Sequence, residues 1–183
     1  MLRPLLLAAA LSVGLGSVGI AHAQTDVQRS ALHDFRVVTV ADGLEIPWSM
    51  AWLPGGDMLI TERAGRLRIV RNGQLLADAV SGVPAVFTTG GQAGLFDVLP
   101  HPDFANNQYI YLSFAKPLEA LGTSTTAVVR GRLVNDRLEG VEEIFVADSM
   151  GGGHYGGRMV FDADGYLFLT SGDRMAPPNG DLA

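Results

Sequence analysis

The chain has 183 residues, with 13 Lys or Arg against 19 Asp or Glu, and a formal net charge of -6 at pH 7. An acidic chain whose single lysine is Lys116 offers little to a phosphate backbone, so nucleic acid is not an expected partner. The chain also has no cysteine. This composition excludes disulfide scaffolds, thiolate metal sites and cysteine nucleophiles, and stability must come from packing.

The first 23 residues have the organisation of a secretory signal peptide. Arg3 supplies a positive start, residues 5–20 form an apolar run, and Ala-His-Ala at 21–23 fits a cleavage site. The run is shorter than the roughly 20 residues that a membrane-spanning helix needs. We therefore expect a protein that is exported to the periplasm or secreted, with no stable membrane span after cleavage.

Short strands dominate the pattern that follows. Residues 24–34 are polar and unpatterned and are interpreted as a disordered leader. From residue 35 onward, apolar runs alternate with turns rich in Gly, Asp and Asn, and no segment of helical period competes. The first strands are expected at 35–40, 48–53, 58–61 and 66–71. Tight turns at 54–57 and 63–65 join the last three into a β-meander.

The meander repeats along the chain. Residues 50–61 align without a gap with 159–170, and a third copy covers 95–114, with outer strands expected at 126–134 and 141–146. Aromatic residues at equivalent positions are expected in the core between units, namely Trp48, Trp52, Phe96 and Phe161. Such repeats are typical of a β-propeller, whereas an antiparallel sandwich would not explain them. Since a ring has roughly four to eight blades, residues 35–183 are interpreted as about the first three blades of one all-β domain in a longer protein.

The glycine-rich segment 151–158 is the candidate site. His154 stands among glycines, so a flat ligand can approach it closely. Residues 159–161 and 166–170 flank an Asp-Gly turn, and their hairpin would bring His154 and Asp173 to one rim. A carboxylate bonded to one imidazole nitrogen fixes the tautomer and raises the basicity of the other nitrogen. The pair is therefore a candidate general base, and the alternative is an ordinary solvated turn.

Four stretches, in order, resemble the soluble quinoprotein sugar dehydrogenases, the glucose and aldose sugar dehydrogenase family. They are PWSMAWLP at 47–54, TERAGRL at 61–67, GQAGLFDV at 91–98 with HPDF at 101–104, and HYGGR at 154–158 through GD at 172–173. Members of this family use pyrroloquinoline quinone (PQQ) and calcium on a six-bladed β-propeller. The resemblance thus implies an enzyme that oxidises aldose sugars to lactones and passes electrons to an acceptor of unknown identity.

The resemblance also implies roles for three residues. His154 matches the general base that takes the proton from the anomeric hydroxyl while hydride passes from that carbon to the quinone. Asp173 matches the carboxylate that orients this base, and Gln92 matches a substrate-binding glutamine. Residues that hold the quinone and calcium are expected mainly beyond Ala183, with no metal ligand in this segment. Gly153 stands where glucose dehydrogenases often have an acidic sugar contact, which favours the broader aldose branch.

Two other functions remain open at this point. A calcium-dependent propeller lactonase or hydrolase would tolerate the loss of His154. A non-catalytic propeller that binds sugar or protein would show no redox activity. The pairing of His154 with Asp173 favours the dehydrogenase over both, and the segment alone is expected to be inactive.

Overall fold

The computed structural model describes residues 27–119 and 122–175, so the predicted signal peptide lies outside the described residues. The chain forms two compact units, Met1–Thr39 and Val40–Ala183. In the first unit, β1 (Val27–Gln28) pairs antiparallel with β2 (Phe35–Arg36). The stretch interpreted as a disordered leader therefore contains a short strand. The strand expected over 35–40 is limited to its first two residues, because β1 provides a partner of only that length.

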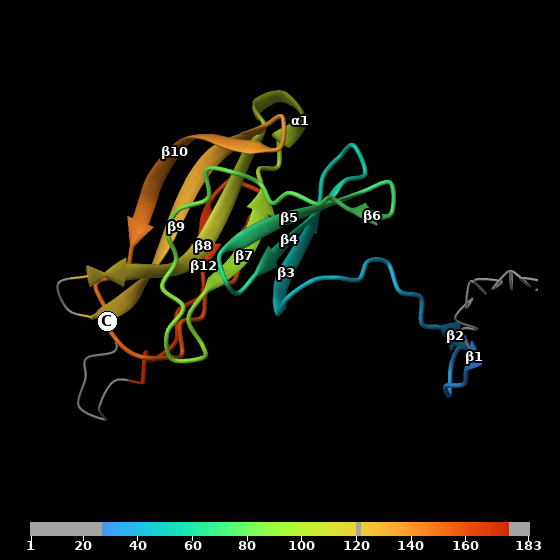
Figure 1. Ribbon diagram of the computed structural model, residues 1–183, viewed down its shortest axis with the longest axis horizontal. Helices are drawn as coiled ribbons and strands as arrows, with labels where there is room; N and C mark the ends of the chain where they lie inside the picture. The colour runs from blue at the N-terminus through green and yellow to red at the C-terminus, as the bar shows by residue number, and fades with distance from the viewer. Residues whose placement is uncertain (1–26, 120–121, 176–183) are drawn as a thin grey trace, which may run out of the picture. The chain divides into compact units, whose positions relative to one another are not determined.

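The second unit begins with the predicted meander. Its four strands are β3 (Pro47–Trp52), β4 (Met58–Glu62), β5 (Arg66–Arg71) and β6 (Gln74–Leu75). They form one antiparallel sheet in sequence order. The turn between β5 and β6 has φ of 52° at Asn72 and 74° at Gly73, the left-handed pair that a tight hairpin requires. This turn leads from β5 to β6, the last strand of the sheet (Figure 1).

A second four-stranded sheet follows. It consists of β7 (Leu95–Pro100), β8 (Tyr109–Leu118), β9 (Thr123–Val134) and β10 (Arg137–Val146), again as neighbours in chain order. The loop between β7 and β8 contains the short helix α1 (Phe104–Asn107), which the sequence pattern did not predict. Left-handed Asn135 and Asp136 join β9 to β10, as their turn-forming side chains predict.

The third repeat starts with a hairpin of β11 (Met159–Phe161) and β12 (Leu167–Leu169). The Asp162 carboxylate accepts the backbone N–H groups of Asp164 and Tyr166, which closes the predicted turn. Two complete meanders and this hairpin confirm the all-β, propeller-type prediction. Within the described ranges, no helix has the length and apolarity to cross a membrane.

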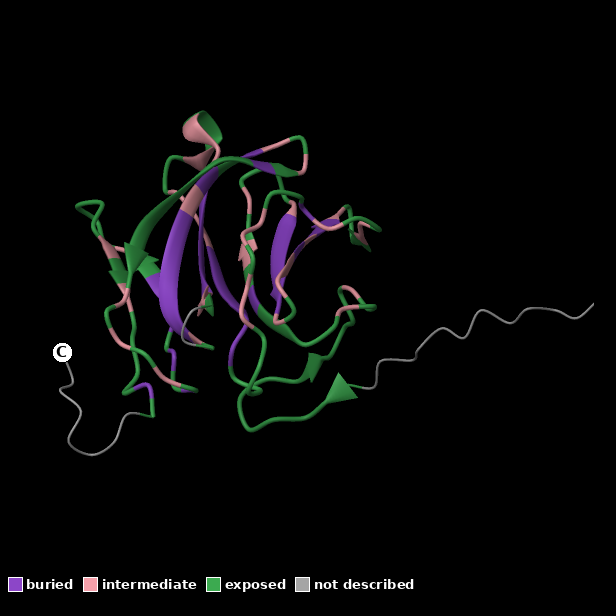
Figure 2. Cartoon of the chain, turned by 60° about the vertical axis from the view of Figure 1, so that its left-hand side comes forward, coloured by how far each residue is buried: buried purple, intermediate pink, exposed green. Residues whose placement is uncertain are grey.

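The main core lies between the two four-stranded sheets. Leu59 and Leu67 of the first sheet belong to the same buried cluster as Leu95, Ile110 and Leu112 of the second. Figure 2 shows these strands in purple, with exposed loops around them. Full burial of each such side chain stabilises the fold by roughly 1.5–3 kcal/mol relative to exposure.

The predicted burial of the repeated aromatic residues is only partly correct. Phe96 is fully buried, but Trp48 and Trp52 are exposed. In β3 the buried residue is Ser49, so the alternation of the strand turns its large apolar side chains outward. Trp48 still contacts Phe96, with ring centroids 5.2 Å apart.

A buried carboxylate connects the first strands of all three repeats. Asp97 in β7 accepts hydrogen bonds from Ser49 Oγ at 2.5 Å and from the Met159 backbone N–H at 2.8 Å. Ser113 reinforces this link, because its hydroxyl accepts the Asp97 backbone N–H at 3.0 Å and donates to the Gly157 carbonyl at 2.5 Å. The polar network therefore sets the position of β11, and of the loop before it, against β7.

We expect Asp97→Ala to destabilise the full-length mature protein by about 2–4 kcal/mol, because two buried donors lose their acceptor. Urea denaturation provides the measurement. Glu142→Ala is the matched control, since it removes an acid from an exposed 2.7 Å pair with Arg130 and should cost less than about 1 kcal/mol. Equal losses in the two variants would show that Asp97 is not a structural link.

Candidate active site

The loops that contain His154 and Asp173 meet beside the β11–β12 hairpin, as the sequence predicts. The hairpin ladder continues past its strands, since Gly157 donates to the Thr170 carbonyl at 2.8 Å and Thr170 donates to the Arg158 carbonyl at 2.9 Å. Beyond it the loops touch backbone to backbone. A Cβ at Gly172 would collide with the His154 carbonyl oxygen, so the contact requires glycine at this position. This close approach places His154 next to Asp173.

The predicted pair of His154 and Asp173 is formed. Nδ1 of the imidazole lies 2.5 Å from Oδ1 of the carboxylate, and both side chains are about half exposed. An ionised carboxylate only accepts hydrogen bonds, so Nδ1 carries the proton in this contact. In the neutral ring, Nε2 is then the acceptor, which is the arrangement that a general base needs.

The environment of Asp173 favours its ionised form. The hydrogen bond from His154 is the largest cause that holds the pKa of the Asp173 carboxyl below its ordinary value, and the backbone N–H of Met175 adds to it. Asp173 therefore stays negatively charged to lower pH than a free aspartate. That charge remains available to stabilise a protonated imidazole at His154.

Gln92 joins the site by a contact that the sequence did not predict. Its Oε1 accepts the backbone N–H of His154 at 2.8 Å. The side chain is exposed, and its amide NH₂ group makes no hydrogen bond to another described residue. Gln92 thus supports His154 with one atom and keeps two donors for a ligand.

Gly153 sits tightly between two side chains. A Cβ at this position would lie 2.5 Å from Met175 Sδ and 2.9 Å from Gln92 Oε1. An acidic residue here would require both neighbours to move. The tight packing around Gly153 therefore agrees with the absence of an acidic residue before His154.

Sequence reasoning missed Arg174, the largest fully buried side chain among the described residues. Its guanidinium donates to backbone carbonyl oxygens of the Gly151–His154 loop and lies over the Tyr155 ring. Nothing in the sequence distinguishes Arg174 from the exposed arginines, because it follows a Gly-Asp turn and has a polar, surface-type side chain.

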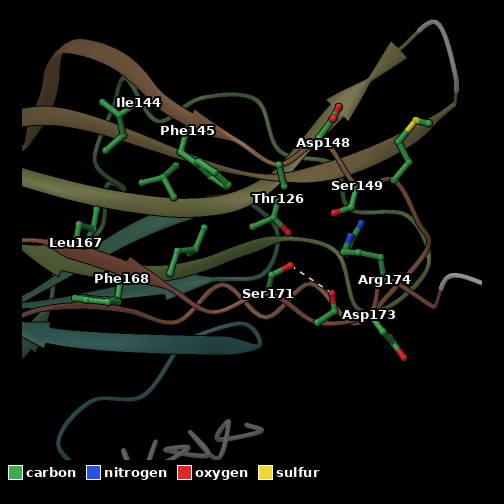
Figure 3. A pocket seen from close by; sticks show the side chains of 15 residues that line it. Thr126, Ile144, Phe145, Asp148, Ser149, Leu167, Phe168, Ser171, Asp173 and Arg174 are labelled. Carbon is green, nitrogen blue, oxygen red and sulfur yellow. Dashed lines mark hydrogen bonds between the residues drawn. The ribbon is translucent and has the colours of Figure 1, made fainter. Parts of the chain in front are cut away.

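Asp173 also lines a cavity of about 890 Å³. Figure 3 shows its two ends, an apolar end with Ile144, Phe145, Leu167 and Phe168, and a polar end with Ser149, Ser171, Asp173 and Arg174. Neither His154 nor Gln92 lines it. We therefore place the candidate site at the exposed side of His154 rather than in this cavity.

The backbone near His154 is open at Gly152. Among the described residues, no atom lies within 4 Å of a Cβ built on Gly152. Across residues 27–119 and 122–175, no group of three or more His, Asp or Glu side chains is arranged to hold a metal ion. The described residues thus offer a histidine–carboxylate pair with open space nearby.

The chain is similar to known proteins in sequence and in fold. A family model described as Glucose / Sorbosone dehydrogenase matches residues 44–182. Aldose sugar dehydrogenase YliI of Escherichia coli is 41% identical over 147 residues, covering 78% of this chain and 39% of that protein. The crystal structure of the soluble aldose sugar dehydrogenase from Escherichia coli in the apo-form matches with a TM-score of 0.72 at 39% identity, over 78% of this chain and 42% of that one.

A structure of the PQQ-bound form of aldose sugar dehydrogenase from Streptomyces coelicolor also matches. Its TM-score is 0.67 at 28% identity, over 76% of this chain and 42% of that chain. The chain spans 31% to 39% of the length of the curated relatives it matches. The similarity therefore covers most of this chain and about a third to two fifths of each relative.

We expect His154→Ala to raise the pKa of Asp173 toward the ordinary aspartate value, because the variant removes the main hydrogen bond to the carboxylate. A carbon-detected NMR titration of the Asp173 carboxyl in the full-length protein measures this. In the wild type, the hydrogen bond between His154 and Asp173 should be fully present at pH values above the ordinary aspartate pKa. It should be lost as the pH falls through the lowered pKa of Asp173. Identical titration of Asp173 in the two proteins would contradict the pairing.

Proposed function

This chain belongs to the glucose/sorbosone dehydrogenase family, and we propose that His154 is the general base of a site that oxidises aldose sugars at the anomeric carbon to lactones. The observation that carries the proposal is the 2.5 Å contact between Nδ1 of the half-exposed His154 side chain and Asp173 Oδ1, which leaves Nε2 outside this contact. Relatives named as aldose sugar and glucose dehydrogenases support the substrate class.

Each of the three site residues has a defined task in this proposal. Nε2 of His154 takes the proton of the anomeric hydroxyl, and Asp173 stabilises the imidazolium that results. The free amide NH₂ group of Gln92 donates to a sugar hydroxyl and orients the ring. General base catalysis of this kind is typically worth about a hundredfold to ten-thousandfold in rate.

PQQ and calcium are the cofactors that we propose for the whole protein. When bound, the quinone supplies the acceptor for the hydride from the anomeric carbon. The PQQ-bound relative and the open backbone at Gly152 support a quinone beside His154. Its ligands and those of calcium would come from the part of the relatives' length that this chain does not span. An external acceptor then takes the electrons onward.

We also propose that the mature protein works in the periplasm or outside the cell. The basis is the signal-like organisation of residues 1–23, with a positive start, an apolar run and a small-residue cleavage site. An absence of cysteine fits an exported protein that needs no disulfide. Sugar oxidation in that compartment needs no uptake of the substrate.

We expect the full-length mature protein to oxidise aldoses with an artificial electron acceptor only after PQQ and calcium are added. His154→Ala should lower kcat by about a hundredfold to ten-thousandfold, because the proton of the anomeric hydroxyl loses its acceptor. His33→Ala is the control, since it removes an exposed histidine elsewhere in the chain and should leave turnover unchanged.

Three outcomes would contradict the proposal. Activity that depends on a nicotinamide cofactor would point to another oxidoreductase. Quinone-independent hydrolysis of a lactone that survives His154→Ala would favour the calcium-dependent hydrolase. Sugar binding without any redox activity after reconstitution would favour a binding protein.

A further inference from the structure

We propose that Arg174 is a positioning residue that, together with Gln92, fixes the peptide group between Gly153 and His154 and thereby aims the imidazole at Asp173. Its importance for turnover rests on the proposed function, in which His154 is the base. The geometric part of the inference concerns only how the histidine is held, and it can be tested without turnover.

Arg174 is a buried cation whose partners are backbone carbonyl oxygens. Nη1 donates to the Gly153 carbonyl at 2.7 Å, and Nη2 donates to those of Gly151 at 2.8 Å and Ser124 at 3.2 Å. The side chain is 1% exposed, and its Nε has no hydrogen-bond partner. A buried charge is costly unless polar groups compensate it, so the three carbonyls are held firmly around the guanidinium.

Tyr155 forms a platform under this guanidinium. The Arg174 Cζ atom lies 3.6 Å from the centre of the Tyr155 ring, a distance suited to a cation–π interaction. The platform is itself fixed, because the Tyr155 hydroxyl bonds Ser124 Oγ at 2.7 Å and its carbonyl accepts from Thr126 Oγ1 at 3.1 Å. Lysine could not reproduce this arrangement, since it lacks a planar fork that bridges several carbonyls and stacks on a ring.

The peptide group that precedes His154 is held at both of its polar ends. Its carbonyl, on Gly153, accepts from Arg174 Nη1, and its N–H, on His154, donates to Gln92 Oε1 at 2.8 Å. Rotation of this peptide group would break both hydrogen bonds at once. Arg174 and Gln92 therefore act on the same backbone unit from opposite sides.

The orientation of this peptide group decides where the imidazole lies. His154 has φ of 48°, a left-handed conformation that is unfavourable for a residue with a Cβ. Without the two hydrogen bonds, the backbone would relax toward negative φ and the ring would leave Asp173. The hydrogen bonds to Arg174 and Gln92 thus hold His154 in a strained conformation that its pairing needs.

The backbone of Arg174 adds a second restraint. A Cβ on Gly151 would collide with the Arg174 carbonyl oxygen, so the 151–153 loop lies directly against the turn that contains Asp173. Because Arg174 follows Asp173 in the chain, its buried side chain anchors the carboxylate's turn as well as the histidine's loop. One side chain therefore couples both members of the pair.

The test compares three full-length variants with the wild type. Arg174→Lys keeps the charge but removes the planar fork, and Gln92→Met removes the acceptor for the His154 N–H. Arg68→Lys is the matched control, because Arg68 also donates to a backbone carbonyl, that of Leu76 at 2.8 Å, and also has an unpartnered Nε, but lies in the first sheet. The first readout is the tautomer of His154 in quinone-free protein, from ¹⁵N chemical shifts of labelled histidine.

We expect the neutral His154 ring to be mainly the Nδ1–H tautomer in the wild type and in Arg68→Lys. Arg174→Lys and Gln92→Met should each shift it to a mixture, because the ring no longer stays on Asp173. In protein loaded with PQQ and calcium, Arg174→Lys should lower kcat by about tenfold to a hundredfold, as misplacement of a catalytic group does. The KM for the sugar should stay within about twofold in that variant, because Arg174 does not face the sugar.

An unchanged tautomer in Arg174→Lys would overturn the inference, and so would an equal change in Arg68→Lys. Should Arg174→Lys fail to fold, Gln92→Met decides, since it alters only an exposed side chain and must change the tautomer if the peptide group is held as described. A wild type without quinone-dependent activity would refute the proposed function, whereas the tautomer measurement would still test the positioning role.

Discussion

The geometry of the site depends on a buried carboxylate that is remote from the chemistry. Asp97 holds Ser49 and the Met159 backbone N–H, so the first strands of three successive repeats share one acceptor. Apolar packing between the sheets is non-directional and would tolerate small slips. Directional hydrogen bonds to the buried Asp97 carboxylate do not tolerate such slips, and they fix the position of β11 relative to β7. The loop that contains His154 leads into β11 at Met159, and its position follows from this link.

The fold could be predicted where local chemistry decides it. The Asn72–Gly73 and Asp162–Gly165 turns fix hairpin register, and their recurrence reveals the repeat before any contact is known. The outward orientation of Trp48 and Trp52 could not be predicted in this way. Their face of β3 is chosen by the bond from Ser49 to Asp97, a tertiary contact between residues 48 positions apart. The short helix α1 and the strand β1 also gave no periodic signal.

The candidate site, like the fold, could be predicted only in part from the sequence. His154 and Asp173 could be placed together because a two-strand hairpin leaves their loops at one rim. Gln92 was included as a substrate-binding residue, but its contact with the His154 N–H could not be foreseen, because it depends on the orientation of one peptide group, and Arg174 was missed entirely. Both depend on the left-handed conformation of His154 and on carbonyls that turn inward. No pattern of residue types reports such backbone orientations.

The central claim is that His154 and Asp173 act as one unit, and a double-mutant cycle tests it most directly. Turnover would be measured for the quinone-loaded, full-length wild type, His154→Ala, Asp173→Asn and the double variant. If Asp173 acts only through His154, the double variant should lose little more activity than His154→Ala alone. Fully additive losses, or near-normal turnover of His154→Ala, would contradict the account and leave the pair as a structural turn.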